Sequence, residues 1–114
     1  MNYKFIRARE EHQRDLMFRS LDRIGAVDLN KYEVIYDGDV ENGQDRVILE
    51  DLYRTFNIDH PADFRAASMS IGDIVMLDRS RLFFCDRVGF VELTGENAPV
   101  RYSRVELNVS RRAV

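Results

Sequence analysis

The chain has 114 residues and a formal net charge of −3, and 45% of its residues are hydrophobic. This length predicts one domain spanning residues 1–114, and the spread of aromatic and β-branched residues excludes a disordered chain. The net charge excludes a general electrostatic attraction to nucleic acid or anionic lipid, and no apolar run is long enough to span a membrane.

A strand and a helix are predicted at the start of the chain. Weak alternation over Tyr3–Arg7 predicts a first, edge-like strand. A helix is predicted over Arg9–Ile24, because apolar residues recur there at i, i+4 and i+7: Met17, Leu21 and Ile24. Gly25 follows directly, at the position where a left-handed residue commonly ends a helix.

A half-buried strand and a second helix are predicted next. Lys31–Tyr36 alternates cleanly, so we expect three residues on one face of this strand: Tyr32, Val34 and Tyr36. Residues 37–45 are rich in Asp, Asn and Gly and are expected to form a connection. A helix over Arg46–Phe56 follows, with Asp45 as its N-cap.

Strands dominate the second half of the chain. The apolar run Ile71–Leu77 predicts a strand buried on both faces. Asp78–Ser80 has hairpin length, so Arg81–Asp86 is expected to be its antiparallel neighbour. Val88–Leu93 is expected to continue that strand past a bulge at Gly89.

The order of the elements predicts an α+β fold. Clustered sequential strands favour a small, mostly antiparallel sheet of about four or five strands over a parallel one. Two helices are expected to pack on one face of the sheet, and alternation over Arg104–Val109 predicts a last strand. A small, partly closed barrel is the alternative architecture.

Five segments of the chain carry a resemblance to a known family. They read MFRSLD (17–22), YEVIYDGDV (32–40), LEDLYRTFNIDHPADF (49–64), SMSIGDIVML (68–77) and DRVGFVEL (86–93). Over residues 3–93 the chain resembles the YodL-like domain family, which comprises uncharacterised bacterial proteins and segments of mobile-element proteins. The resemblance therefore implies a fold and a mobile-element setting, and no reaction. The chain departs from the family at Ala66 and Ala67, where a Gly-His pair is more common.

His60 and Asp63 form the first candidate ligand-binding site. A histidine flanked by carboxylates can hold a divalent ion or act as a general base. A metal site usually needs three or four converging ligands, and neither His12 nor Cys85 stands at ligand spacing. We therefore predict no metal and no cofactor, and interpret His60 and Asp63 as the cap of a short turn at Pro61.

Ser68, Ser70 and Asp73 form the second candidate ligand-binding site. Two hydroxyl groups before a buried strand can contact a phosphate together with backbone amides. The segment contains neither a Gly-rich phosphate loop nor a G-x-S-x-G motif. We favour a turn in which Ser70 bonds the backbone near Asp73, and this segment is where we most expect a binding residue.

Arginines accumulate near the C-terminus. Residues 79–114 carry seven arginines against four acidic residues, whereas residues 1–78 carry 10 basic and 16 acidic residues. Arginines beside Phe83 and Phe84 can bind single-stranded nucleic acid, and the candidates are Arg79, Arg81, Arg101 and Arg104. The sheet motif of RNA-binding domains is absent, so a solvated face is the favoured interpretation.

The remaining signals concern compartment and function. Cys85 is the only cysteine and the N-terminus lacks the apolar segment of a signal peptide, so we expect a cytoplasmic protein. With no complete catalytic signature, we predict no catalytic residues and a non-catalytic binding or protein-interaction module of a bacterial mobile-element protein. A nucleic-acid-binding module is the first alternative, and a small enzyme with a site around His60 and Ser70 is the second.

A protein partner or a homodimer is also expected. Phe83 and Phe84 are consecutive in a strand and should point to opposite faces of the sheet. Two helices on one face would leave one ring uncovered, and soluble monomers seldom expose a large apolar patch. A second copy or a permanent partner would cover it.

Overall fold

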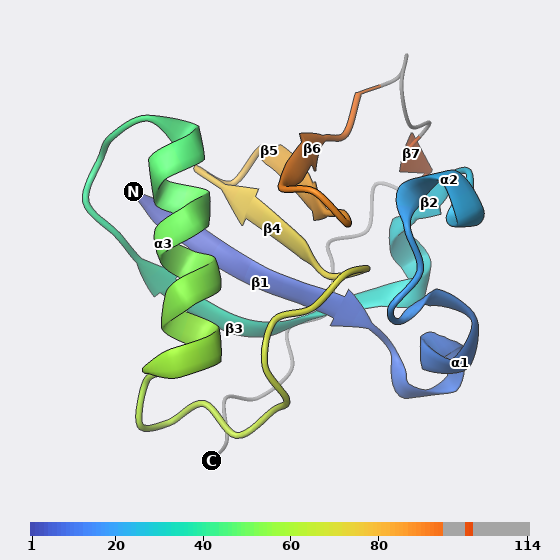
Figure 1. Cartoon of the computed structure of the whole chain (residues 1–114), viewed down its shortest axis with the longest axis horizontal. Helices are drawn as coiled ribbons and strands as arrows, with labels where there is room; N and C mark the ends of the chain where they lie inside the picture. The colour runs from blue at the N-terminus through green and yellow to red at the C-terminus, as the bar shows by residue number, and fades with distance from the viewer. Residues whose placement is uncertain (95–99, 102–114) are drawn as a thin grey trace.

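An antiparallel sheet of five strands forms the centre of the molecule (Figure 1). The computed structural model describes residues 1–94 and 100–101. The sheet has the order β3-β1-β4-β5-β6 and every neighbouring pair is antiparallel. Its strands are β1 (Asn2–Ala8), β3 (Tyr32–Asp39), β4 (Ile74–Leu77), β5 (Arg81–Cys85) and β6 (Phe90–Glu92). Two short strands, β2 (Val27–Asp28) and β7 (Val100–Arg101), form a separate parallel pair.

One long helix and several short helical segments accompany the sheet. The long helix is α3 (Asp45–Ile58), which lies across one face of the sheet (Figure 1). The short segments are the 3-10 helix η1 (Glu10–His12), α1 (Gln13–Leu16), α2 (Leu21–Ile24) and the 3-10 helix η2 (Leu29–Lys31). All four belong to the connection from β1 to β3.

Two apolar clusters hold the layers together, one on each face of the sheet. The first packs α3 against the sheet through Ile48, Leu49, Leu52 and Phe56, which meet Tyr3, Phe5, Val75 and Phe83. The second packs the connection between β1 and β3 against the opposite face, with Leu21, Val27 and Leu29 meeting Ile6, Ile74 and Phe84. Each cluster contains residues from β1, β4 and β5, so these strands are covered on both sides.

The expected α+β class and mostly antiparallel sheet are confirmed, and the sheet is not closed into a barrel. Two details of the expectation are corrected. The helical segments lie on both faces of the sheet, because α2 packs on the face opposite α3. In addition, β1 is an interior strand between β3 and β4 and is not at an edge.

The predicted hairpin of β4 and β5 is confirmed. The two strands pair from Ile74 with Phe84 to Leu77 with Arg81. Asp78 and Arg79 adopt left-handed backbone conformations in the connecting turn, which matches the twist of an antiparallel hairpin. The expected bulge at Gly89 is wrong, because Gly89 belongs to a turn closed by the amide of Asp86 and leads into the separate strand β6.

A bulge in β3 changes the expected faces of that strand. Phe5 pairs with Tyr36 and the next residue, Ile6, pairs with Val34, so Ile35 has no partner in β1. The extra residue turns the side chains on either side of it to opposite faces. Tyr36 therefore packs with α3, whereas Tyr32 and Val34 pack in the second cluster, and the expected single face is wrong.

The predicted helix over Arg9–Ile24 is also wrong. The chain forms separate short helical segments and is extended at Met17. The Phe18 amide donates to the carbonyl of Ile71 at 2.9 Å, so a tertiary hydrogen bond replaces the one that a continuous helix would make. Gly25 does end α2 and has a positive φ of 81°, but its ψ of −93° lies outside the left-handed helical region that was expected.

The remaining differences lie at α3 and at the C-terminus. Asp45 is the first residue of α3 and Gln44 is its N-cap. The predicted strand Arg104–Val109 lies outside the described residues.

Phe83 and Phe84 do face opposite sides of the sheet, as expected. Both are buried within the chain, so neither ring is left uncovered in the way that motivated the prediction of a homodimer.

Candidate functional site: a cleft beside a buried ion pair

A buried ion pair joins the end of β1 to the start of β4. Ile6 pairs with Ile74, which makes Arg7 and Asp73 neighbours across the two strands. Arg7 Nε donates to Asp73 Oδ1 at 2.9 Å and Arg7 Nη2 donates to Asp73 Oδ2 at 2.8 Å. Arg7 is 5% exposed and Asp73 is fully buried, so this is a bidentate charge pair shielded from water.

The surroundings of Arg7 and Asp73 fix both side chains. Arg7 Nη2 also donates to the Ser68 carbonyl at 2.8 Å, and the guanidinium carbon lies 5.0 Å from the centre of the Phe5 ring. The Ser70 amide donates to Asp73 Oδ2 at 2.7 Å. Burial raises the pKa of Asp73, while the hydrogen bonds and charge of Arg7 and the Ser70 amide oppose that rise.

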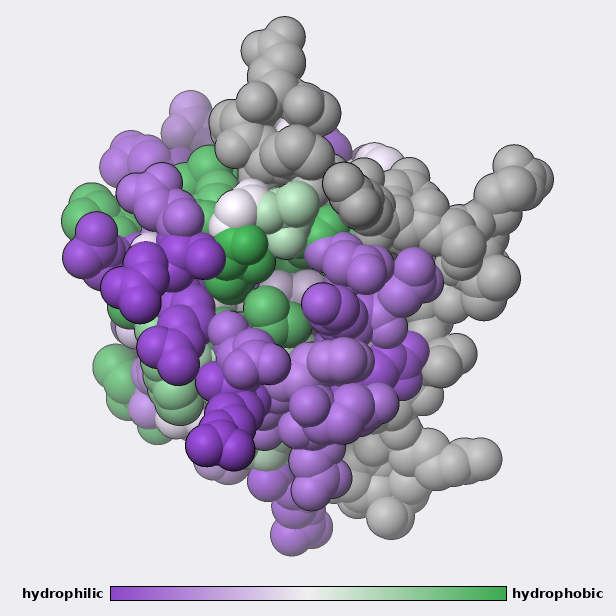
Figure 2. Space-filling view, turned by 90° about the vertical axis from the view of Figure 1, so that its right-hand side faces the viewer, coloured by the Kyte–Doolittle hydropathy of each residue, from purple (hydrophilic) through white to green (hydrophobic). Residues whose placement is uncertain are grey.

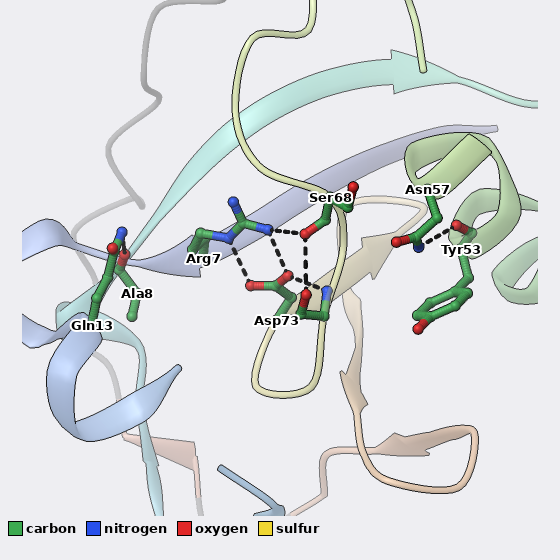
Figure 3. Close-up of polar contacts among 8 residues, drawn as sticks. Arg7, Ala8, Gln13, Tyr53, Asn57, Ser68 and Asp73 are labelled. Atoms are coloured by element: carbon green, nitrogen blue, oxygen red, sulfur yellow. Dashed lines mark hydrogen bonds and ion pairs between the residues drawn. The ribbon is translucent and has the colours of Figure 1, made fainter. Parts of the chain in front are cut away.

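One guanidinium nitrogen remains for a ligand. Arg7 Nε and Nη2 carry the bonds described above, and Figure 3 shows the third nitrogen, Nη1, pointing away from Asp73. Arg7 lines a cleft of about 580 Å³ whose other lining residues are Gln13, Arg14, Met17, Phe18, Arg19 and Ala67. Arg7 is therefore a lining residue of an open cleft, and Asp73 and the Ser68 carbonyl fix its guanidinium in place.

The rim of the cleft consists of cations and apolar side chains. Arg14, Arg19 and Phe18 are all exposed, and the Phe18 side chain is 69% exposed. On the side of the molecule that carries α1 and α2, hydrophobic and hydrophilic residues lie next to each other on the surface (Figure 2). The cleft thus combines positive charge with an accessible aromatic ring.

The backbone at Phe18 is strained. Its φ is 62°, in the left-handed region that a bulky residue rarely occupies and that costs on the order of 1–3 kcal/mol. The bond from its amide to the Ile71 carbonyl holds it there. Gly72 permits this approach, because a Cβ at that position would lie 2.7 Å from the Leu16 carbonyl oxygen. Two segments that are distant in the sequence, 16–18 and 71–72, therefore hold an exposed aromatic residue in an unfavourable conformation.

The predicted residues around His60 lie apart from this cleft lining. The turn at Pro61 exists, since the Phe64 amide donates to the Pro61 carbonyl at 2.9 Å. His60 is exposed and its ring packs against Phe64, with 5.6 Å between ring centres. Asp63 accepts a 2.7 Å bond from the Tyr36 hydroxyl, which connects this loop to β3.

The second predicted group, Ser68, Ser70 and Asp73, lies next to the cleft, because Asp73 and the Ser68 carbonyl bind Arg7 and Arg7 lines the cleft. Ser70 and Asp73 form the expected turn, closed by the Asp73 amide donating to the Ser70 carbonyl at 3.0 Å. The Ser70 hydroxyl donates to the Ser68 carbonyl at 3.3 Å. None of these three residues lines the cleft, but Ala67 beside them does. In the structure this segment holds the Arg7 side chain through the Ser68 carbonyl and the Asp73 carboxylate, and its role as a ligand-binding segment stays a prediction.

Arg7 itself was missed as a site residue. One signal for it was present in the sequence. Side chains alternate along a strand, so the predicted strand places Arg7 on the same face as Tyr3 and Phe5. A charged residue in line with two aromatic core residues requires a buried partner.

Three of the four candidate nucleic-acid residues lie in the described part of the chain, and they belong to different elements. Arg81 forms an ion pair with Asp45, and Arg79 is exposed in the turn between β4 and β5. Arg101 lies in β7 and Arg104 lies outside the described residues. With both neighbouring phenylalanines buried, β5 offers no ring on which a base can stack.

Two further ionisable groups are buried near Asp73. Burial and, to a smaller extent, the charge of Asp73 raise the pKa of the Cys85 thiol to about 12. The same two causes, in that order, raise the pKa of Tyr32 to about 12. Within the described residues no group of three or more His, Cys, Asp and Glu side chains could hold a metal ion. None of the helices in that part of the chain is long and apolar enough to cross a membrane.

These features define a small α+β domain in which a five-stranded antiparallel sheet carries one long helix on one face and an irregular connection on the other. The family model described as the YodL-like domain matches residues 2–95, and the chain belongs to this family. No curated protein and no solved structure gave a match.

Proposed function

We propose that this domain is a non-catalytic module that binds a segment of a partner protein in the cleft above Arg7. The observation that carries the proposal is Phe18, an exposed aromatic residue held in a left-handed conformation. Strained residues concentrate at functional sites, and exposed aromatic side chains are frequent anchors of protein interfaces. The bond to the Ile71 carbonyl keeps the Phe18 backbone fixed, so the exposed ring is held in place for a ligand.

The polar groups with catalytic potential support binding over chemistry. Asp73 is engaged by Arg7 and by the Ser70 amide, and the Cys85 thiol is buried with a raised pKa. His60 has Phe64 and the Pro61 carbonyl as its neighbours, and no nucleophile is among them. We retain the setting implied by the family, a cytoplasmic protein associated with a bacterial mobile element, as part of this proposal.

A peptide-display selection on the immobilised domain tests the proposal. Selected peptides should lose binding at least tenfold to Phe18→Ala, because the anchor ring is removed. The matched control is Val88→Ala, since Val88 is 92% exposed and lies in the turn after β5. Peptides that bind Phe18→Ala as well as they bind the unmodified domain would refute this location. A selection that yields no binding peptide would refute the proposed function.

A further inference from the structure

The charges on the cleft indicate which kind of segment it takes. Three of its seven lining residues are arginines and none is acidic. Asp73 neutralises the charge of Arg7, whereas Arg14 and Arg19 have no ion-pair partner among the residues that the structure describes. The cleft is therefore locally positive on a chain whose net charge is −3.

Arg7 adds a donor of fixed direction. Asp73 binds one edge of its planar guanidinium, and the Ser68 carbonyl accepts a further bond from Nη2. The Arg7 side chain is therefore already ordered, so a hydrogen bond from Nη1 to a ligand costs little additional conformational entropy. An oxygen of a carboxylate or a main-chain carbonyl is the matching acceptor. Met17 and Phe18 supply apolar surface next to it.

We propose that the cleft recognises an acidic peptide segment, in which an apolar side chain packs on Phe18 and neighbouring carboxylates meet Arg14 and Arg19. This inference rests on the proposed function and specifies its ligand. The partner oxygen closest to the sheet accepts from Arg7 Nη1. A nucleic acid strand fits less well, because the net charge of the whole chain repels a long polyanion while two local arginines suffice for a few carboxylates.

The test compares peptide selections on three forms of the full chain. Peptides selected on the unmodified domain should be enriched in Asp and Glu beside an apolar residue. Selection on Arg14→Glu/Arg19→Glu should lose this enrichment, and acidic peptides should bind this variant roughly tenfold more weakly at physiological salt. Arg87→Glu is the matched control, because Arg87 is exposed in the turn between β5 and β6 and does not line the cleft.

Two further measurements separate the possible outcomes. On adding a selected acidic peptide, the NMR signals of the Arg7 side-chain N–H groups and of the Phe18 amide should shift together. Peptides that need Phe18 but show no preference for acidic residues would overturn the acidic inference and leave the proposed function standing. A single-stranded oligothymidine that binds the unmodified domain more tightly than the peptides, and loses binding on Arg14→Glu/Arg19→Glu, would also overturn it.

Discussion

The Arg7–Asp73 pair allows a sharp test of how this sheet is stabilised. Replacing Asp73 by Ala would leave the Arg7 guanidinium almost fully buried without its counter-charge, and would remove the acceptor of the Ser70 amide. Breaking a buried ion pair on one side typically costs about 3–5 kcal/mol. Arg7→Met should cost a similar amount, because it leaves the Asp73 carboxylate buried with only the Ser70 amide as a donor.

The double variant Arg7→Met/Asp73→Ala should lose less free energy of unfolding than the sum of the losses in the two single variants. It contains no buried charge. Besides the ion pair itself, of which both partners are removed, it breaks two hydrogen bonds, one to the Ser68 carbonyl and one from the Ser70 amide. Each lost bond is worth about 1 kcal/mol, so we expect a total cost of about 2–3 kcal/mol. The interaction free energy between the two sites should therefore exceed about 2 kcal/mol.

Urea unfolding followed by far-ultraviolet circular dichroism measures these costs, since the chain contains no tryptophan for fluorescence. A domain of this size has about 5–15 kcal/mol of stability, so each single variant should fold with a reduced midpoint. A double variant whose cost equals the sum of the single costs would refute the reasoning, because it would show that the two side chains do not interact in solution.

Three further results are expected. Tyr32→Phe should raise the free energy of unfolding by about 1 kcal/mol in urea titrations, because the buried Tyr32 hydroxyl has no hydrogen-bond partner among the described residues; a loss of stability would contradict this. The folded-state pKa values of Cys85 and Tyr32 lie near 12, above their ordinary values of 9.0 and 10.0, so the unfolded chain releases these protons first. Stability should therefore fall between about pH 9 and 12, by up to about 1.4 kcal/mol per pH unit for each group, and Tyr32→Phe should flatten the upper part of that decline. Gly72→Ala should lower the thermal midpoint more than Gly89→Ala, since both glycines have positive φ but only a Cβ at Gly72 meets the backbone of Leu16; equal effects would show that the two segments are not in contact.

Local patterns in the sequence predicted the parts of the fold that depend on neighbouring residues. The hairpin of β4 and β5 follows from two apolar runs separated by a three-residue turn, and α3 follows from its apolar stripe. Both signals are complete within a short stretch of chain. Packing against the rest of the molecule stabilises both elements without changing where they begin and end.

The two largest errors, the helix over Arg9–Ile24 and the face of Tyr36, depend on contacts between distant residues. The helix over Arg9–Ile24 fails because Phe18 bonds Ile71, and periodicity within one segment carries no trace of that bond. The face of Tyr36 depends on one unpaired residue, Ile35, whose effect on the register is visible only when β1 is placed beside β3.

In the candidate site, too, local features could be predicted from the sequence and contacts between distant residues could not. The turn at Ser70 was predicted from its own residues, and that segment does adjoin the cleft. The Arg7–Asp73 pair joins residues 66 positions apart, so no spacing rule could connect them. Only the position of Arg7 on an apolar strand face signalled that a buried partner was needed.

The interior position of β1 has a consequence for the synthesis of this chain on the ribosome. The strand that is made first has partners on both sides, and β3 can pair with it early, whereas β4 is translated only after α3 and the loop that follows. At about 5–20 residues per second, one hydrogen-bonding edge of β1 stays open for several seconds in the nascent chain. Phe5 and Ile6 lie on that strand, so the growing polypeptide exposes an apolar edge that can pair with other chains. We expect this domain to depend on a low level of expression or on chaperones that bind nascent chains, even though β1 has hydrogen-bonded neighbours on both sides in the folded molecule.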